Sequence, residues 1–349
     1  MTNKFNIQSL IRPNVAKMKP YSSARDEFKH FDNEMIFLDA NENPFETNVN
    51  RYPDPQQRQL KSILSKQKNI PIDQILLGNG SDEVLDLIFR AFCEPAKDNI
   101  ITLPPTYGMY NVLANLSNIE NREVLLNSDF QPDLDEILRT ADARSKLLFI
   151  CSPNNPTGNL IASEKILRLL QTFNGIIVID EAYIDFANAQ SWISKLKDFP
   201  NLIVTQTLSK AYGLAGIRLG ICYASKEIIS VLNKIKAPYN INKLTQQIAF
   251  QQLQDIRTVY GKINLIKADR ERLLKALLQI EFIKKVYPTN ANFILIKVDN
   301  AEKRYLQLLK NGIVVRNRSS QPLCENTLRI TIGTTPENEK LITILKQLK

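Results

Sequence analysis

The feature that most constrains the fold is a series of short apolar runs between residues 75 and 225, separated by amphipathic stretches. Strands that alternate with helical segments in this way are typical of a mainly parallel sheet with crossover helices. Unbroken Ile, Leu and Val runs predict strands buried on both faces. The runs are NIITL (99–103), KLLFICS (146–152), GIIVID (175–180), NLIVTQT (201–207) and RLGICYA (218–224). Because ligands of such sheets bind beyond the carboxyl ends of the strands, we expect the site residues to follow these runs.

The remaining sequence predicts a second, smaller unit. With 349 residues the chain exceeds the usual size of a single core, so we expect a large domain and a small one. The stretch from Asn242 to Ile280 lacks proline and has recurrent Leu and Ile, which predicts one or two long linking helices. Beyond it, the strand-like segments FILIKV (293–298) and LRITIG (328–333) flank a helical stretch and indicate a small α+β unit.

The composition excludes several kinds of site and partner. A single histidine, His30, excludes His-cluster metal sites, serine triads and cysteine-histidine dyads, which leaves lysine as the best candidate proton carrier. The net charge of +9 is scattered and lacks a nucleic-acid-binding signature, so it predicts a basic surface. No signal peptide or membrane-spanning run is evident, which predicts a cytoplasmic protein. Reduced thiols buried in the core are expected of Cys93, Cys151, Cys222 and Cys324.

Two glycine-containing loops are candidate ligand contacts. GNGSDE (78–83) precedes a helical pattern in which Ser81 and Asp82 are good helix caps, so free backbone N–H groups could receive a phosphate there. A dinucleotide fingerprint would need a further glycine where Glu83 stands, and Gly-Asn-Gly is also an ordinary tight turn. The loop PNNPTG (153–158) presents Asn155 at the predicted sheet edge, although a plain turn explains it equally well.

The two loops after the next predicted strands carry the candidate catalytic residues. In DEAY (180–183), Asp180 ends a wholly apolar strand, where a carboxylate needs a cation or a hydrogen-bond donor unless it caps a helix. In TLSKAYGLAGIRLG (207–220), hydroxyl groups and an arginine surround Lys210 and could bind a phosphate. A nearby arginine and a shielded pocket would lower the pKa of that lysine, so its amine could bond to a carbonyl carbon.

These motifs, in this order and spacing, resemble the fold type I pyridoxal-phosphate aminotransferases, and the resemblance covers nearly the whole chain. It implies an α/β fold whose large domain has a mainly parallel seven-stranded sheet flanked by helices, with a smaller α+β domain. The expected divisions are an arm (1–44) that contributes to the small domain and the site, a large cofactor-binding domain (45–240) and a small C-terminal domain (241–349).

The resemblance also implies a role for each site residue. Lys210 would anchor pyridoxal phosphate covalently and move the proton, and Asp180 would hold the ring nitrogen protonated. Asn155 and Tyr183 would donate to the phenolic oxygen of the ring, and Tyr107 would stack on the ring. The residues expected to hold the cofactor phosphate are Ser81, Asp82, Thr207, Ser209 and Arg218.

Further motifs narrow the resemblance to the subfamily that transaminates histidinol phosphate. These are KPYSSARDE (19–27), FLDANENP (37–44), RYPDP (51–55) and IVVRNRSS (313–320), together with GNGSDE and LRITIG. Tyr52 would then reach the partner's cofactor phosphate, which implies a homodimer. Tyr21, Arg316 and Arg329 would bind the anionic group of the substrate, with Arg318 as an alternative to Arg316.

The implied reaction exchanges an amino group between the phosphorylated amine L-histidinol phosphate and the 2-oxo acid 2-oxoglutarate. An aromatic-amino-acid aminotransferase and a phosphothreonine decarboxylase of the same fold remain alternatives, because relatives share the cofactor residues and differ in substrate contacts. A cofactor-binding regulator or nucleic-acid-binding module is disfavoured, because no segment is left for a helix-turn-helix domain.

Overall fold

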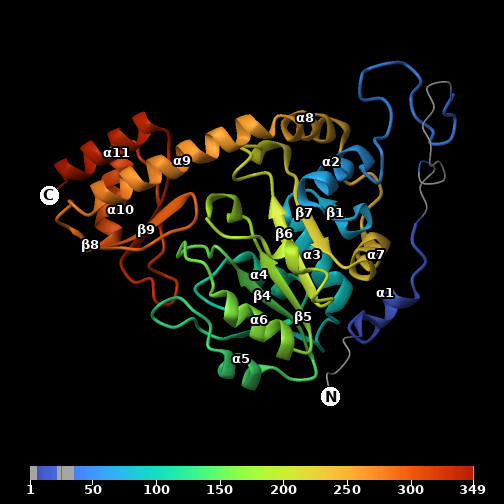
Figure 1. Ribbon diagram of the computed structural model, residues 1–349, viewed down its shortest axis with the longest axis horizontal. Helices are drawn as coiled ribbons and strands as arrows, with labels where there is room; N and C mark the ends of the chain where they lie inside the picture. Colours follow the sequence, from blue (N-terminus) through green and yellow to red (C-terminus); the bar gives the residue numbers. More distant parts are fainter. Residues whose placement is uncertain (1–5, 22–24, 26–34, 349) are drawn as a thin grey trace.

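A seven-stranded sheet forms the centre of the larger part of the molecule (Figure 1). The computed structural model describes residues 6–21, 25 and 35–348. Strand β7 is antiparallel to its neighbours β6 and β1, whereas the other adjacent pairs are parallel, so the predicted mainly parallel sheet is confirmed. In spatial order the strands are β1 (Ile75–Gly78), β7 (Gly220–Ala224), β6 (Leu202–Thr207), β5 (Ile176–Asp180), β4 (Ser145–Cys151), β2 (Asn99–Thr102) and β3 (Glu120–Glu123).

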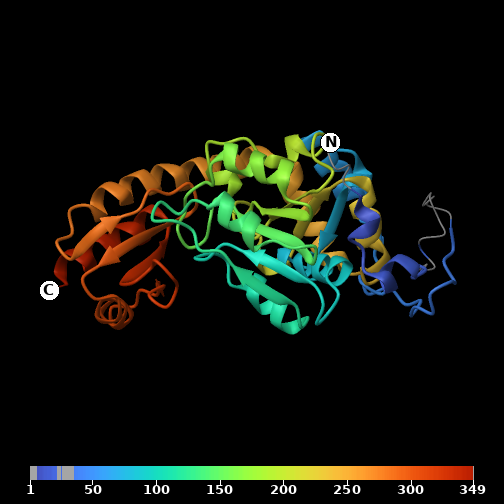
Figure 2. The same cartoon turned by 90° about the horizontal axis from the view of Figure 1, so that it is seen from below.

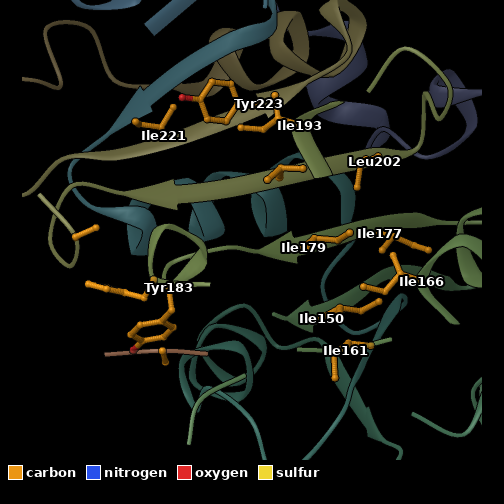
Figure 3. Packing of buried hydrophobic residues seen from close by; sticks show 14 of the residues in the cluster. Ile150, Ile161, Ile166, Ile177, Ile179, Tyr183, Ile193, Leu202, Ile221 and Tyr223 are labelled. Atoms are coloured by element: carbon orange, nitrogen blue, oxygen red, sulfur yellow. The ribbon is translucent and has the colours of Figure 1, made fainter. Parts of the chain in front are cut away.

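Helices cover both faces of this sheet, because successive side chains of its buried strands point to opposite sides. In β5, Ile177 and Ile179 join one apolar cluster, which Figure 3 shows, and Ile176 and Val178 join the other. The first cluster packs against α2 (Arg58–Lys68), α5 (Leu134–Thr140), α6 (Ser163–Thr172), α8 (Lys243–Gln254) and α9 (Ile256–Leu277). The second packs against α3 (Ser81–Phe92), α4 (Met109–Leu116) and α7 (Lys226–Ile235). All four cysteines are buried and unpaired, as expected.

The C-terminal part contains an antiparallel four-stranded sheet, set apart from the large sheet (Figures 1 and 2). The predicted long helices are α8 and α9, and the 22-residue α9 runs from the large sheet to the small one. No helix among the described residues is long and apolar enough to cross a membrane. The small sheet has the order β10 (Arg316–Asn317), β11 (Thr327–Thr331), β9 (Phe293–Val298) and β8 (Ile283–Val286), and packs with α9, α10 (Ala301–Lys310) and α11 (Thr335–Gln347).

The described part of the N-terminal arm differs from the expectation that residues 1–44 contribute to the small domain. Helix α1 (Pro13–Lys17) and the turn before it lie on the side of the large sheet remote from the small one (Figure 1). Ile7, Leu10, Ile11 and Val15 are buried in the same apolar cluster as α3 and α7. Their spacing of three to four residues gives this segment one apolar face, and the nearest open apolar surface belongs to the large domain.

Candidate active site

The candidate site lies beyond the carboxyl ends of β4, β5 and β6, where the sequence predicted it. Cys151, Asp180 and Thr207 are the last residues of these strands, and the loops that follow supply the other side chains. A cavity opens there, and its lining includes all the predicted cofactor residues except Tyr52. The lining consists of Ser81, Asp82, Tyr107, Cys151, Asn155, Asp180, Ala182, Tyr183, Thr207, Ser209, Lys210 and Arg218.

Asp180 is a buried carboxylate with two hydrogen-bond donors, and only 3% of its surface is exposed. The Tyr110 hydroxyl donates to Oδ2 at 2.9 Å, and the backbone N–H of Ala182 donates to Oδ1 at 3.1 Å. Burial raises the pKa of Asp180, and the hydrogen bond from Tyr110 is the main effect that opposes this rise. A positively charged ligand group against this carboxylate would offset the cost of its burial.

Tyr110 is a site residue that sequence reasoning missed. It is fully buried in α4, stacks on Phe149 with a ring-centroid distance of 4.8 Å, and lies edge-on to Tyr107 at 5.6 Å. The only available signal was a second tyrosine three residues after Tyr107 in PPTYGMY, and because α4 begins at Met109, helical spacing does not relate the two residues. Its hydroxyl bond to Asp180 depends on contacts between α4 and β5 that no local pattern encodes.

Lys210 follows β6 and is exposed toward the cavity rather than enclosed by protein. Partial burial lowers its pKa, and the charge of Arg329 is the next largest cause, with a smaller contribution from Arg218. The carboxylates of Asp180 and Asp82 oppose this effect. The lysine therefore lies within electrostatic reach of arginines from both sheets, and a larger fraction of its amine is unprotonated near neutral pH than for a free lysine.

Three hydroxyl groups and an arginine form a second part of the cavity, which we call the hydroxyl cup (Ser81, Thr207, Ser209 and Arg218). Thr207 Oγ1 lies 3.0 Å from Ser209 Oγ, and Arg218 Nη1 lies 3.5 Å from the same oxygen. A helix N-terminus with free N–H groups beside an arginine favours anions.

The start of α3 differs from the prediction that Ser81 and Asp82 cap it. Gly80 occupies the cap position with φ of 81°, and Ser81 and Asp82 are the first two helical residues. A Cβ at Gly80 would lie 2.5 Å from Arg218 Nη2, and one at Gly220 would lie 2.2 Å from the backbone nitrogen of Ser81. Because both positions lack a side chain, β7 and Arg218 can approach the first turn of the helix closely.

The carboxylate of Asp82 is engaged within the protein. Its Oδ1 accepts a hydrogen bond from the Tyr107 hydroxyl at 3.1 Å, and its Oδ2 lies 3.7 Å from Arg218 Nη2. An ionised carboxylate is an acceptor only, so it cannot donate to an anion. Any contribution of Asp82 to anion binding must therefore come from its backbone N–H or from holding Tyr107 and Arg218 in place.

Asn155 connects the cavity to the small sheet. Its side-chain nitrogen lies 3.4 Å from the Tyr183 hydroxyl, and its Oδ1 accepts a short hydrogen bond from Arg329 Nη1. Arg329 also lies over the Phe293 ring at 5.2 Å, and Phe293 contacts Tyr183 edge-on at 5.1 Å. Figure 3 shows Tyr183 in the loop after β5, apart from the isoleucines of the sheet.

Strand register places Arg316 and Arg318 relative to Arg329. Arg316 is directly opposite Arg329 in the β10–β11 pair, so their side chains lie on the same face of the small sheet. Arg318 is two residues further along and shares that face, because side chains alternate along an extended strand. Arg316 is exposed, whereas Arg318 is partly buried and interacts electrostatically with Tyr183. We call this surface the arginine face (Arg316, Arg318 and Arg329).

Tyr21 and Tyr52 do not join the cavity within one chain. Tyr21 is 73% exposed and follows α1, and that helix lies on the side of the large sheet remote from the small sheet (Figure 1). Tyr52 is 51% exposed and stacks on Tyr239 with a centroid distance of 4.4 Å. The predicted convergence of Tyr21 with Arg316 and Arg329 is therefore absent from the single chain that the structure describes. The sequence's only histidine, His30, lies outside the described residues.

Comparison with known proteins agrees with this arrangement. The family model for aminotransferase class I and II matches residues 35–345. A histidinol-phosphate aminotransferase of Flavobacterium johnsoniae is 63% identical over 347 residues, which are 99% of each chain. The crystal structure of a histidinol-phosphate aminotransferase from Clostridium acetobutylicum is 29% identical, with a TM-score of 0.79 over 86% of this chain and 91% of that one. The fold is also that of the Sinorhizobium meliloti histidinol-phosphate aminotransferase, solved with pyridoxal-5'-phosphate, which has a TM-score of 0.79 at 24% identity over 86% and 83% of the chains. The chain thus belongs to the class I and II aminotransferase family.

Proposed function

We propose that this protein is a pyridoxal-phosphate enzyme that transfers an amino group between L-histidinol phosphate and 2-oxoglutarate, a step of histidine biosynthesis. The products are imidazole-acetol phosphate and L-glutamate. The observation that carries the proposal is the placement of Lys210 in one cavity with Asp180, within electrostatic reach of Arg218 and Arg329. The 63% identity to a full-length relative of that name supports the choice of substrate.

The residues of the cavity fit the cofactor. The hydroxyl cup and the first turn of α3 offer donors for a phosphate group, and the two glycines let Arg218 and β7 lie close to that turn. Asp180 is a buried carboxylate that would accept a hydrogen bond from the protonated ring nitrogen, and Tyr107 offers an aromatic face. Asn155 and Tyr183 would donate to the phenolic oxygen. When bound, pyridoxal phosphate supplies a carbon for the amino group and a ring that absorbs the electrons left by deprotonation.

Lys210 supplies the base. Its lowered pKa leaves part of the amine unprotonated, so Nζ would hold the cofactor at its carbonyl carbon and, once free of it, would accept a proton from the substrate carbon. The open side of the cavity gives the amine room to move between these positions. Asp180 stays in place throughout, because Tyr110 and the Ala182 N–H hold both of its oxygens.

The arginine face supplies a common anchor for both substrates. The phosphate of histidinol phosphate and the distal carboxylate of glutamate are both anions, and an arginine fork can bind either with paired hydrogen bonds. Arg329 is hydrogen-bonded to Asn155 at the cavity wall. A substrate whose anionic group is bound by Arg329 would therefore extend toward Lys210.

The decisive assay uses the purified protein reconstituted with pyridoxal phosphate. We expect rapid glutamate formation from L-histidinol phosphate and 2-oxoglutarate, and much slower transfer from L-phenylalanine. Carbon dioxide release is measured in parallel with O-phospho-L-threonine. Absence of turnover with the phosphate ester overturns the proposed substrate, and turnover confined to phenylalanine or release of carbon dioxide identifies the aromatic aminotransferase or the decarboxylase instead.

The proposal includes a homodimer in which Tyr52 contacts the partner's site. Its exposure and its distance from the cavity of its own chain support this arrangement. Co-expressed Lys210→Ala and Tyr52→Phe chains test it. A mixed dimer then contains one site with both residues intact, so activity reappears above that of either variant alone. If Tyr52 acts within its own chain, every site keeps one defect and mixing restores nothing. A cytoplasmic location also belongs to the proposal and is compatible with four unpaired cysteines.

A further inference from the structure

The arginine face contains one arginine more than is needed to bind a carboxylate. Register places Arg316 opposite Arg329, and the backbone N–H of Arg318 donates to the Thr327 carbonyl at 2.9 Å. Arg318 therefore projects from the same side of the sheet as the other two, while Leu328 on the opposite side packs into the core of the small domain. Cross-strand and diagonal neighbours in such a pair lie within reach of long side chains.

Arg318 is partly buried without a charge partner. Its Nε is buried and lacks a hydrogen-bond acceptor, as does Nε of Arg329. Within the described part of the chain, no carboxylate forms an ion pair with any of the three arginines. Other buried arginines in the structure are paired, for example Arg304 with Asp299 at 2.6 Å. A structural arginine would be expected to follow that pattern, because an unpaired buried cation costs free energy.

The neighbouring charges increase the free-energy cost of burying Arg318. Burial, Arg329 and Arg316 together lower the pKa of Arg318 to about 10. The same position is electrostatically coupled to Tyr183, which lines the cavity, so the charge acts on the site. Like charges held together without counterions are relieved by an anion, and an anion with two charges relieves them more than an anion with one.

We propose that Arg318 is a specificity-determining residue that makes the arginine face select a doubly charged phosphate monoester over a singly charged carboxylate. This inference rests on the proposed function and adds the substrate charge that the site prefers. A phosphate monoester carries a charge near −2 at neutral pH and offers three acceptor oxygens, whereas a carboxylate carries −1 and offers two. Arg316 and Arg329 suffice for a carboxylate, and Arg318 meets the third oxygen of the phosphate.

The test compares two ligands of similar shape that cannot react, phenyl phosphate and benzoate, as inhibitors of the cofactor-loaded enzyme. In Arg318→Gln we expect the inhibition constant of phenyl phosphate to rise about 10- to 100-fold, and that of benzoate less than about 3-fold, the range for losing one hydrogen bond to a charged group. Binding measured by calorimetry gives the same ratio without turnover. Arg139→Gln is the control, because Arg139 lies on the exposed surface of α5 and pairs with Glu136.

Arg318→Lys keeps the charge but loses the planar fork, so it should retain part of the preference for phenyl phosphate. If the glutamine variant does not fold, the two ligands are compared in Arg318→Lys instead. Equal losses for the two ligands, or no loss, overturn the inference. If the wild-type enzyme does not turn over histidinol phosphate but still prefers phenyl phosphate through Arg318, the proposed reaction fails while the assignment of Arg318 stands.

Discussion

The hydroxyl cup and the arginine face are two anion-binding surfaces built in different ways. The cup combines hydroxyl groups, one arginine and the first turn of α3, all from the large domain. The arginine face uses three guanidinium groups on two short strands of the small sheet. A helix start and strand ends hold a ligand in one fixed place, whereas long side chains on strands can adapt to different anions. The contrast suits a resident cofactor on one side and two exchanging substrates on the other.

Asp180 belongs to neither surface, so its replacement should affect the chemical step and not binding. Apart from the replacement of Lys210, it should give the largest loss of kcat. We expect Asp180→Asn to lower kcat about 10²–10³-fold, the range for removing a preorganised electrostatic contact. The KM values and cofactor occupancy should change little. Single-turnover kinetics with L-histidinol phosphate measure the chemical step directly. A variant that loses the cofactor but keeps kcat when saturated with it would contradict this role.

Exchanging a cation in each surface tests the comparison itself. Arg218→Gln should weaken cofactor retention about 10- to 100-fold with substrate KM nearly unchanged, and Arg329→Gln should raise the KM of both substrates by a similar factor. Equilibrium dialysis of the cofactor and steady-state kinetics at saturating cofactor provide the two readouts. If both variants lose the same property, the division between the two surfaces is wrong.

The sequence allowed the cup to be predicted better than the arginine face. Three of its four members, Thr207, Ser209 and Arg218, lie within twelve residues and follow one strand, so a local pattern brings them together. The relation between Arg316, Arg318 and Arg329 depends on the register of β10 with β11, which a sequence does not specify for a two-residue strand. For the same reason, no local pattern predicts the contact of Arg329 with Asn155, 174 residues away.

In the fold as a whole, too, features encoded by a local pattern were predicted and features that depend on distant contacts were not. The alternation of apolar runs predicted the mainly parallel sheet, and the helices of residues 243–277 were expected from their length and lack of proline. The position of the N-terminal arm was not predicted, because its four apolar residues would pack equally well on any open apolar surface. The cap of α3 was misplaced by one residue, since Ser81 and Asp82 are good caps locally but the close approach of Arg218 requires glycine at the cap itself.

Tyr110 offers a smaller test, which concerns how Asp180 stays ionised. Removing its hydroxyl in Tyr110→Phe removes the main effect that lowers the pKa of Asp180, so the pKa rises further. Because the ionised form is the active one, the acidic limb of the kcat–pH profile should move to higher pH, with a loss of a few-fold, at most about 10-fold, near neutrality. Tyr223→Phe is the matched control, since Tyr223 is equally buried and its hydroxyl has no hydrogen-bond partner among the described residues. Identical shifts in both variants would contradict the role of Tyr110.

The smallest effect on activity is expected next to the site, at Glu181. Its carboxylate accepts hydrogen bonds from Ser191, the Trp192 N–H and Gln206 and points away from the cavity, while burial raises its pKa from 4.5 to about 7. The folded state then holds a proton that the unfolded state releases between pH 4.5 and 7, so the free energy of unfolding falls as pH rises through this window and is constant above it. Its size is about 3 kcal/mol at 1.36 kcal/mol per pKa unit.

Thermal unfolding between pH 4.5 and 8 measures this contribution. Glu181→Gln should flatten the pH dependence within that window and leave kcat within about 3-fold, because the residue supports the fold next to the site without facing the cavity. Glu136→Gln, on the exposed surface of α5, is the control. A steeper dependence in Glu181→Gln would contradict the sign of the shift.

The central claim is that Lys210 both anchors the cofactor and moves the proton between the substrate carbon and the cofactor. The most direct test is the absorbance of the reconstituted protein with and without L-histidinol phosphate, in the wild type and in Lys210→Ala. We expect the wild type to show a visible band from the covalently attached cofactor, and the substrate to bleach it as the amino group is transferred. Lys210→Ala should lack that band and the transfer. A variant that keeps the band and still forms glutamate when 2-oxoglutarate is added would contradict the account.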